Sequence, residues 1–171
     1  MAKIEQEPID AARSPVLLEV QKLDTNSIVA LVGHPLHVMM VHFPVAFVIA
    51  TLGADVFYWW SGDAFWVRAG LWAAGVAFWT GVAASAVGTA ELLLVRGIRL
   101  LEASWSHAVA AMTLLAVAGA NWGLRLAYPE SILPHGLALW ALASVMTGFA
   151  GWHGGNLVFD HGVGVLVSPK S

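Results

Sequence analysis

Four long apolar stretches constrain the fold of this chain more than any other feature. They cover residues of about 34–60, 64–95, 103–126 and 133–159. Each stretch has the twenty or so residues that a helix needs to cross about 30 Å of hydrocarbon at 1.5 Å per residue. Only 11% of the residues are charged, whereas a soluble domain has about 25%. We therefore predict an all-α integral membrane protein.

The segments between the apolar stretches are short, which predicts an up-down-up-down four-helix bundle. Asp63 follows a Ser-Gly turn and is placed to cap the second helix. We assign residues 31–171 to this transmembrane domain and residues 1–30 to a polar N-terminal tail. Within the tail, residues 14–23 have the apolar spacing of a short amphipathic helix on the membrane surface. A frayed tail is the alternative.

Composition also excludes several classes of function. The chain has no cysteine, which excludes thiolate-ligated iron–sulfur clusters, covalently attached c-type haem and disulfides. A formal net charge of −3 argues against a nucleic-acid partner. Residues 1–29 do not have the pattern of a signal peptide, so we expect the first span to act as an uncleaved insertion signal.

The histidines gather in one half of the predicted bundle. We call side A the membrane side at which the first span begins. In an alternating bundle the third span also begins at side A and the fourth ends there. Six of the seven histidines then fall in the side-A half, and only His135 lies at the opposite end, side B. The six are His34, His37, His42, His107, His153 and His161. Ionisable side chains are costly in hydrocarbon, so such a group is a candidate functional site.

One interpretation of this group is a site for b-type haem, whose iron takes axial imidazoles within an apolar slot. Depths estimated from the helical rise suggest His42 with His107 for one haem, and His37 with His161 for a second, although the partners can be exchanged between the two pairs. His34 shares a helix face with His37 and is a further candidate. Two other interpretations stay open: a bound divalent metal such as zinc or copper, and hydrogen bonds between helices.

Charged residues within the spans give two smaller predictions. Asp55 and Arg68 both approach side B, where they either pair with each other or reach the lipid headgroups. Glu91 lies in the half that holds the histidines. Its carboxylate can orient a ligating imidazole, or it is an interfacial carboxylate at a helix end.

Two motifs resemble those of a bacterial membrane-protein family catalogued as domain of unknown function 2231. They are GHPLHVMMVHFP, Gly33 to Pro44, and GGNLVFDHGVGV, Gly154 to Val165. The resemblance covers Gly33 to Val167 and implies a four-helix, multi-pass protein of the bacterial inner membrane with both termini on one side. His153 departs from the pattern, because the family usually has an apolar residue there. Some members are fused to domains resembling periplasmic pyrroloquinoline-quinone sugar dehydrogenases or cytochromes.

The fusions imply electron transfer toward the quinone pool. We therefore predict an electron-transfer subunit rather than a stand-alone enzyme, binding one haem b or two. It would pass electrons between a partner redox protein, within a larger respiratory or dehydrogenase complex, and quinone. The alternatives are a non-catalytic accessory subunit and a histidine-rich metal-binding membrane protein. The excess of Lys and Arg at side A favours cytoplasmic termini, whereas the fusions imply that side A is periplasmic.

Overall fold

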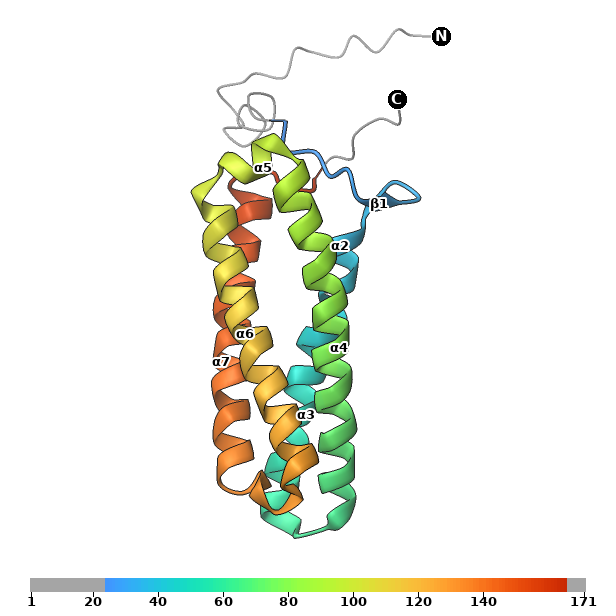
Figure 1. The fold of residues 1–171 in the computed structure, drawn as a ribbon, viewed down its shortest axis with the longest axis vertical. Helices are drawn as coiled ribbons and strands as arrows, with labels where there is room; N and C mark the ends of the chain where they lie inside the picture. Colours follow the sequence, from blue (N-terminus) through green and yellow to red (C-terminus); the bar gives the residue numbers. More distant parts are fainter. Residues whose placement is uncertain (1–23, 166–171) are drawn as a thin grey trace, which may run out of the picture.

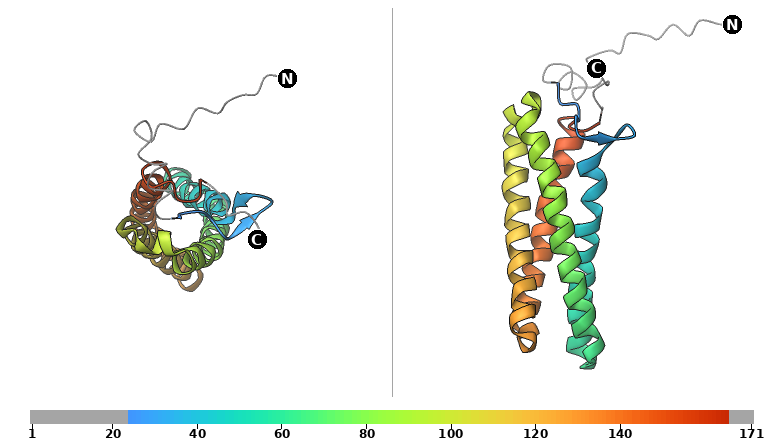
Figure 2. Two further views of the ribbon diagram at one scale, coloured as in Figure 1. Left: turned by 90° about the horizontal axis from the view of Figure 1, so that it is seen from above. Right: turned by 45° about the vertical axis from the view of Figure 1, so that its right-hand side comes forward.

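The protein has four long helices, and these lie side by side (Figure 1). The computed structural model describes residues 24–165. The long helices are α3 (His42–Ser61), α4 (Ala64–Leu94), α6 (Glu102–Ala127) and α7 (His135–Phe159). Helix α3 packs against α4 and α7, and α6 packs against the same two helices. Seen from above, they form a ring in which α3 and α6 are diagonal (Figure 2). The predicted all-helical membrane fold is confirmed.

Three helical segments of the described region are long and apolar enough to cross a membrane: Leu36–Ser61, Ala64–Leu94 and Glu102–Ala127. Helix α7 has 25 residues and the sequence predicts it as a fourth span, but it is not among these three. It carries His153 and several glycines, which lower its mean hydropathy.

The first span begins differently from the predicted start at about residue 34. A two-stranded antiparallel hairpin, β1 (Ala30–Leu31) and β2 (His34–Pro35), precedes the short helix α2 (Leu36–Met40). Helix α3 then begins at His42, after an interruption at Val41. Pro44 accounts for this break, because it has no N–H to donate to the carbonyl of Met40 and its ring crowds the preceding turn.

The connections between the long helices are short. Gly62 ends α3 in the left-handed conformation (φ +67°), and the side chain of Asp63 accepts a hydrogen bond from the backbone N–H of Phe65 at 2.8 Å. The predicted cap of the second helix is therefore confirmed. Helix α5 (Arg96–Leu100) links α4 to α6, and the 3-10 helix η2 (Pro129–Ile132) precedes α7.

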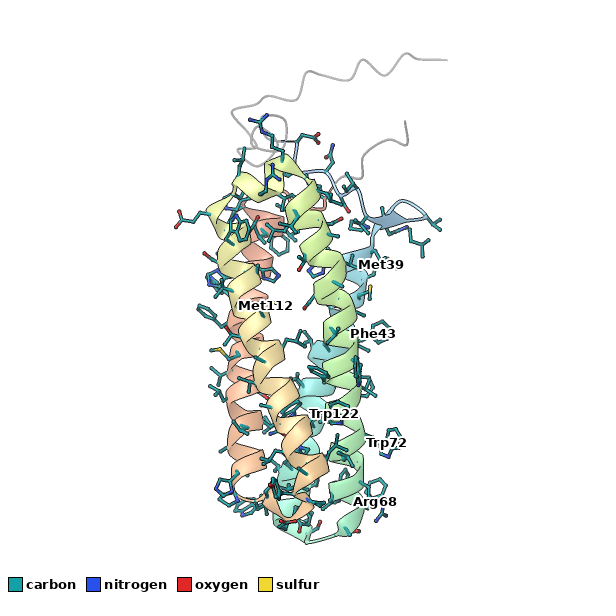
Figure 3. The ribbon with its side chains drawn as sticks, in the orientation of Figure 1. Met39, Phe43, Arg68, Trp72, Met112 and Trp122 are labelled. Atoms are coloured by element: carbon teal, nitrogen blue, oxygen red, sulfur yellow. The ribbon has the colours of Figure 1, made fainter. Side chains whose placement is uncertain are left out.

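A cluster of mostly small residues forms the middle of the bundle and lets the four helices approach closely. Trp140 fills the space between them, and its indole N–H donates to the carbonyl of Val48 at 2.8 Å. Large apolar side chains instead cover the outside, as Met39, Phe43 and Trp72 do in Figure 3. The buried members of the central cluster are Val48, Ala74, Ala77, Ala118, Trp140 and Ala143.

Part of the predicted N-terminal tail packs against the bundle. Thr25 and Ser27 are fully buried. The hydroxyl of Ser27 donates to the Glu91 carboxylate, which also accepts from the backbone N–H of Val29 at 3.2 Å. Glu91 thus holds this segment on α4. The predicted amphipathic helix at residues 14–23 lies outside the described residues.

Candidate functional site: a histidine pair across the bundle

Two histidines from diagonal parts of the ring meet in the side-A half. His37 lies on α2, and His107 lies in the second turn of α6. Their ring centroids are 6.3 Å apart and their planes are inclined by 78°. Both side chains are half-buried. The structure therefore brings together one histidine from the first span and one from the third.

Each imidazole is oriented by a backbone carbonyl of a neighbouring long helix. The Nδ1 atom of His37 lies 2.9 Å from the carbonyl oxygen of Ala84 on α4. The Nδ1 atom of His107 lies 3.1 Å from the carbonyl oxygen of Ala150 on α7. A carbonyl oxygen only accepts, so Nδ1 must carry the proton in both rings. In the neutral imidazoles, Nε2 is then the atom with a free lone pair, which is the tautomer that binds a metal through Nε2.

Glycines make room for both rings. A Cβ atom at Gly88 would lie 2.7 Å from Cε1 of His37, and one at Gly154 would lie 3.2 Å from Cε1 of His107. Each glycine comes about one helical turn after the alanine whose carbonyl holds the ring. The two histidines therefore lie in matching environments: His37 packs against α4, and His107 packs against α7.

Gly88→Ala is expected to displace the His37 ring and break its bond to Ala84, because the new methyl group would overlap the imidazole. Overpacking of this kind costs about 1–3 kcal/mol. Thermal unfolding in detergent, followed by tryptophan fluorescence, measures the loss. Gly53→Ala is the matched control, since a Cβ there meets none of the described residues within 4 Å. Equal midpoints for the two variants would contradict the close fit of His37 against α4.

A cavity of about 90 Å³ lies beside the histidine pair. His37 and His107 both line it, and most of the other lining residues are apolar. Ser104 also lines it; this residue is 3% exposed, and its hydroxyl has no hydrogen-bond partner within residues 24–165. The cavity is large enough for several waters or for part of a larger group. Its further lining residues are Ser85, Gly88, Thr89, Glu91, Leu92, Ile98, Ala108, Ala111, Met112, Leu157 and Val163.

The other candidate histidines lie elsewhere. His42 is exposed, with Nδ1 3.3 Å from the carbonyl of Met39, and does not line the cavity with His107. His34 is exposed in the β1–β2 hairpin, where it contacts the carbonyl of Val32 at 2.9 Å. His161 follows α7 and is partly buried, but it does not line the cavity with His37. Neither His42 with His107 nor His37 with His161 lines this cavity as a pair, whereas His37 and His107 do.

His153 lies on α7, just beyond Ala150, and its ring packs edge-on against Phe149 at 4.5 Å. His135 begins α7 at side B and is exposed. Within residues 24–165 no group of three or more His, Cys, Asp or Glu side chains is arranged to hold a metal ion.

At side B a second polar group is buried between the helices. Arg125 Nη2 contacts Asp55 Oδ2 at 2.5 Å, and both side chains are 1% exposed. The Nε–H of Arg125 donates to Asn121, whose amide donates to the carbonyl of Gly136 at 2.7 Å. The predicted Asp55–Arg68 pair is therefore wrong. Arg68 is exposed at the outside of α4 (Figure 3), whereas Asp55 is buried and contacts Arg125 of α6.

Comparison with protein families gives one match. The family described as "Predicted membrane protein (DUF2231)" matches residues 33–166, which is most of the chain. The chain belongs to this family. The DUF2231 match includes both histidines of the pair and the glycines beside them. Searches of curated proteins and of solved structures find no match.

Proposed function

We propose that this DUF2231 protein binds b-type haem and carries electrons in the membrane, and that His37 and His107 are the residues that would hold the haem. One observation carries the proposal: two imidazoles from diagonal parts of the ring meet with Nδ1 committed to a carbonyl and Nε2 left as the ligating atom. Hydrogen bonds of this kind orient metal-binding histidines and fix their tautomer. This pairing replaces the two pairings derived from depth.

The residues present fit a metal-centred group held between the rings. The two rings, whose centroids are 6.3 Å apart, would hold the group from opposite sides of the bundle. Two neutral imidazoles are a usual donor set for low-spin haem iron. The small side chains of Ala108 and Ala111 on the cavity wall would let a flat macrocycle approach α6.

The haem iron would supply one-electron chemistry, and the protein would set its position and potential. His37 and His107 would hold it, and the carbonyls of Ala84 and Ala150 would keep both rings in the ligating tautomer. The apolar residues of the cavity wall would lower the local dielectric, which is one of the ways a protein tunes such a group.

We further propose that the chain works in the bacterial inner membrane as a subunit of a larger respiratory or dehydrogenase complex that exchanges electrons with quinone. Support comes from the resemblance to family members fused to dehydrogenase-like or cytochrome domains. The exposed apolar side chains around α3 and α4 provide the surface for lipid or for a membrane partner. The basic residues at side A favour termini in the cytoplasm.

A dithionite-reduced minus oxidised absorption spectrum of the protein, purified in detergent from cells supplied with haem, tests the proposal. We expect the sharp α and Soret bands of low-spin b-type haem, and a pyridine haemochrome value near one haem per chain. A flat spectrum from folded protein would overturn it. Stoichiometric zinc or copper in such a colourless sample would support the metal-binding alternative, and co-purification with a larger enzyme would support an accessory role.

A further inference from the structure

The histidine pair and the Asp55–Arg125 pair are separated by the same number of residues along both spans that carry them. The spacing in sequence from His37 to Asp55 equals the spacing from His107 to Arg125. This spacing makes about five full turns at 3.6 residues per turn, so each pair of side chains lies on one helix face. The histidines meet at side A and the charged residues meet at side B.

The glycines on the other two helices keep the same spacing. Gly70 precedes Gly88 on α4 by this interval, and Gly136 precedes Gly154 on α7 by the same interval. Gly88 and Gly154 lie against the histidine rings at side A. At side B a Cβ on Gly70 would lie 2.9 Å from Nη1 of Arg125, and one on Gly136 would lie 3.7 Å from Nη2.

The central core repeats the pattern. Adding one constant to the residue number takes His37 to His107 and Asp55 to Arg125. Adding a second, slightly smaller constant takes both glycines of α4 to those of α7. The same two shifts divide the whole buried central cluster into three matched pairs, which are Val48 with Ala118, Ala74 with Trp140, and Ala77 with Ala143. Each matched position faces the same interior from opposite sides of the ring.

We infer that the chain consists of two equivalent helical hairpins, residues 36–94 and 106–159, packed about a pseudo-two-fold axis, and that the Asp55–Arg125 ion pair fixes one hairpin against the other. This inference does not rest on haem binding. At the matched positions of the side-A group the residues are identical. At side B the matched positions carry opposite charges, so there one half complements the other.

Because the Asp55–Arg125 ion pair is buried, it strongly favours one arrangement of the two helical hairpins. Both side chains are 1% exposed, and they reach across the diagonal of the ring. An unpaired charge in such a place is strongly unfavourable, so an arrangement that separates Asp55 from Arg125 is penalised. Because the two positions are equivalent under the pseudo-symmetry, exchanging the two charges should preserve the pair.

Exchange of the two side chains tests the inference. We expect the single variants Asp55→Arg and Arg125→Asp to lower the unfolding midpoint by about 10 °C or more, because each places two like charges in the interior. The double variant, Asp55→Arg with Arg125→Asp, should recover about half of that loss or more. Recovery should be incomplete, since Thr51 stands where Asn121 supports Arg125. Tryptophan fluorescence in detergent gives the midpoints.

Arg68→Asp is the matched control, because Arg68 is exposed at the same end of the bundle, and its midpoint should change little. A double variant that is no more stable than the worse single variant would overturn the inference. If the single variants cannot be purified, the monodisperse fraction in size-exclusion chromatography is compared instead, and only recovery in the double variant supports exchangeable halves. None of these measurements depends on haem, so failure here is distinct from failure of the proposed function.

Discussion

Replacement of either His37 or His107 by alanine is expected to remove the low-spin b-type haem spectrum. Each variant deletes one of the two imidazoles that meet across the bundle, and the haem would lose one of the two residues proposed to hold it. The protein should stay folded, because the backbone hydrogen bond that each ring makes is worth about 0.5–1.5 kcal/mol. Reduced-minus-oxidised spectra, normalised to protein, measure the loss.

His42→Ala and His34→Ala are the matched controls, since both side chains are exposed and lie away from the cavity. Their spectra should match that of the unmodified protein. The reverse pattern, in which His42→Ala bleaches the haem and His37→Ala leaves it intact, would refute the proposed ligand pair. It would favour the pairing that depth alone suggests.

Arg125→Met is expected to destabilise the protein by about 3–5 kcal/mol, because it leaves the Asp55 carboxylate buried without its partner. The methionine has a similar length, so the packing against Trp140, whose ring centre lies 5.9 Å from the guanidinium carbon, is largely kept. The loss of the positive charge opposite Asp55, rather than lost packing, is therefore the main contribution to the destabilisation. Denaturant or thermal unfolding in a mild detergent measures it.

Arg68→Met controls for the loss of a positive charge at side B, and we expect a change within about 0.5 kcal/mol because Arg68 is exposed. A second control, Asp55→Asn combined with Arg125→Met, removes both charges. This double variant should be more stable than Arg125→Met alone, since no unpaired carboxylate remains at this site. Equal stability of the two would show that the cost comes from packing rather than from the buried charge.

The fold could be predicted because its cause is local. A run of about twenty apolar residues has only one common way to satisfy its backbone in lipid, which is a helix, and short polar links force neighbours to be antiparallel. The cap at Asp63 follows from the same local chemistry. The break at Val41 could have been inferred from Pro44, and the hairpin of residues 30–35 depends on positive φ at Val32 and Gly33.

The partners of the polar side chains were harder to predict, because they depend on the rotation of each helix about its axis. The depth estimate carried no information on helix rotation, so it left His42 as a partner for His107, but His42 faces outward from α3. Depth also placed Asp55 near Arg68, whereas the inward face of α6 supplies Arg125. The equal spacing of His37 from Asp55 and of His107 from Arg125 was a signal in the sequence that marks the inward faces.

On the proposed function, the five-turn spacing between the histidine pair and the Asp55–Arg125 pair has a consequence for energy conversion. Five turns of about 5.4 Å each separate them by about 27 Å, nearly the thickness of the hydrocarbon layer. An electron received and released at the histidine pair would therefore stay near one membrane surface. Moving one elementary charge through the full transmembrane potential requires about 2.3 kcal/mol per 100 mV. Electron transfer confined to the histidine pair would avoid most of that work. On the proposed function, electron transfer at the histidine pair would by itself do little work against the transmembrane voltage.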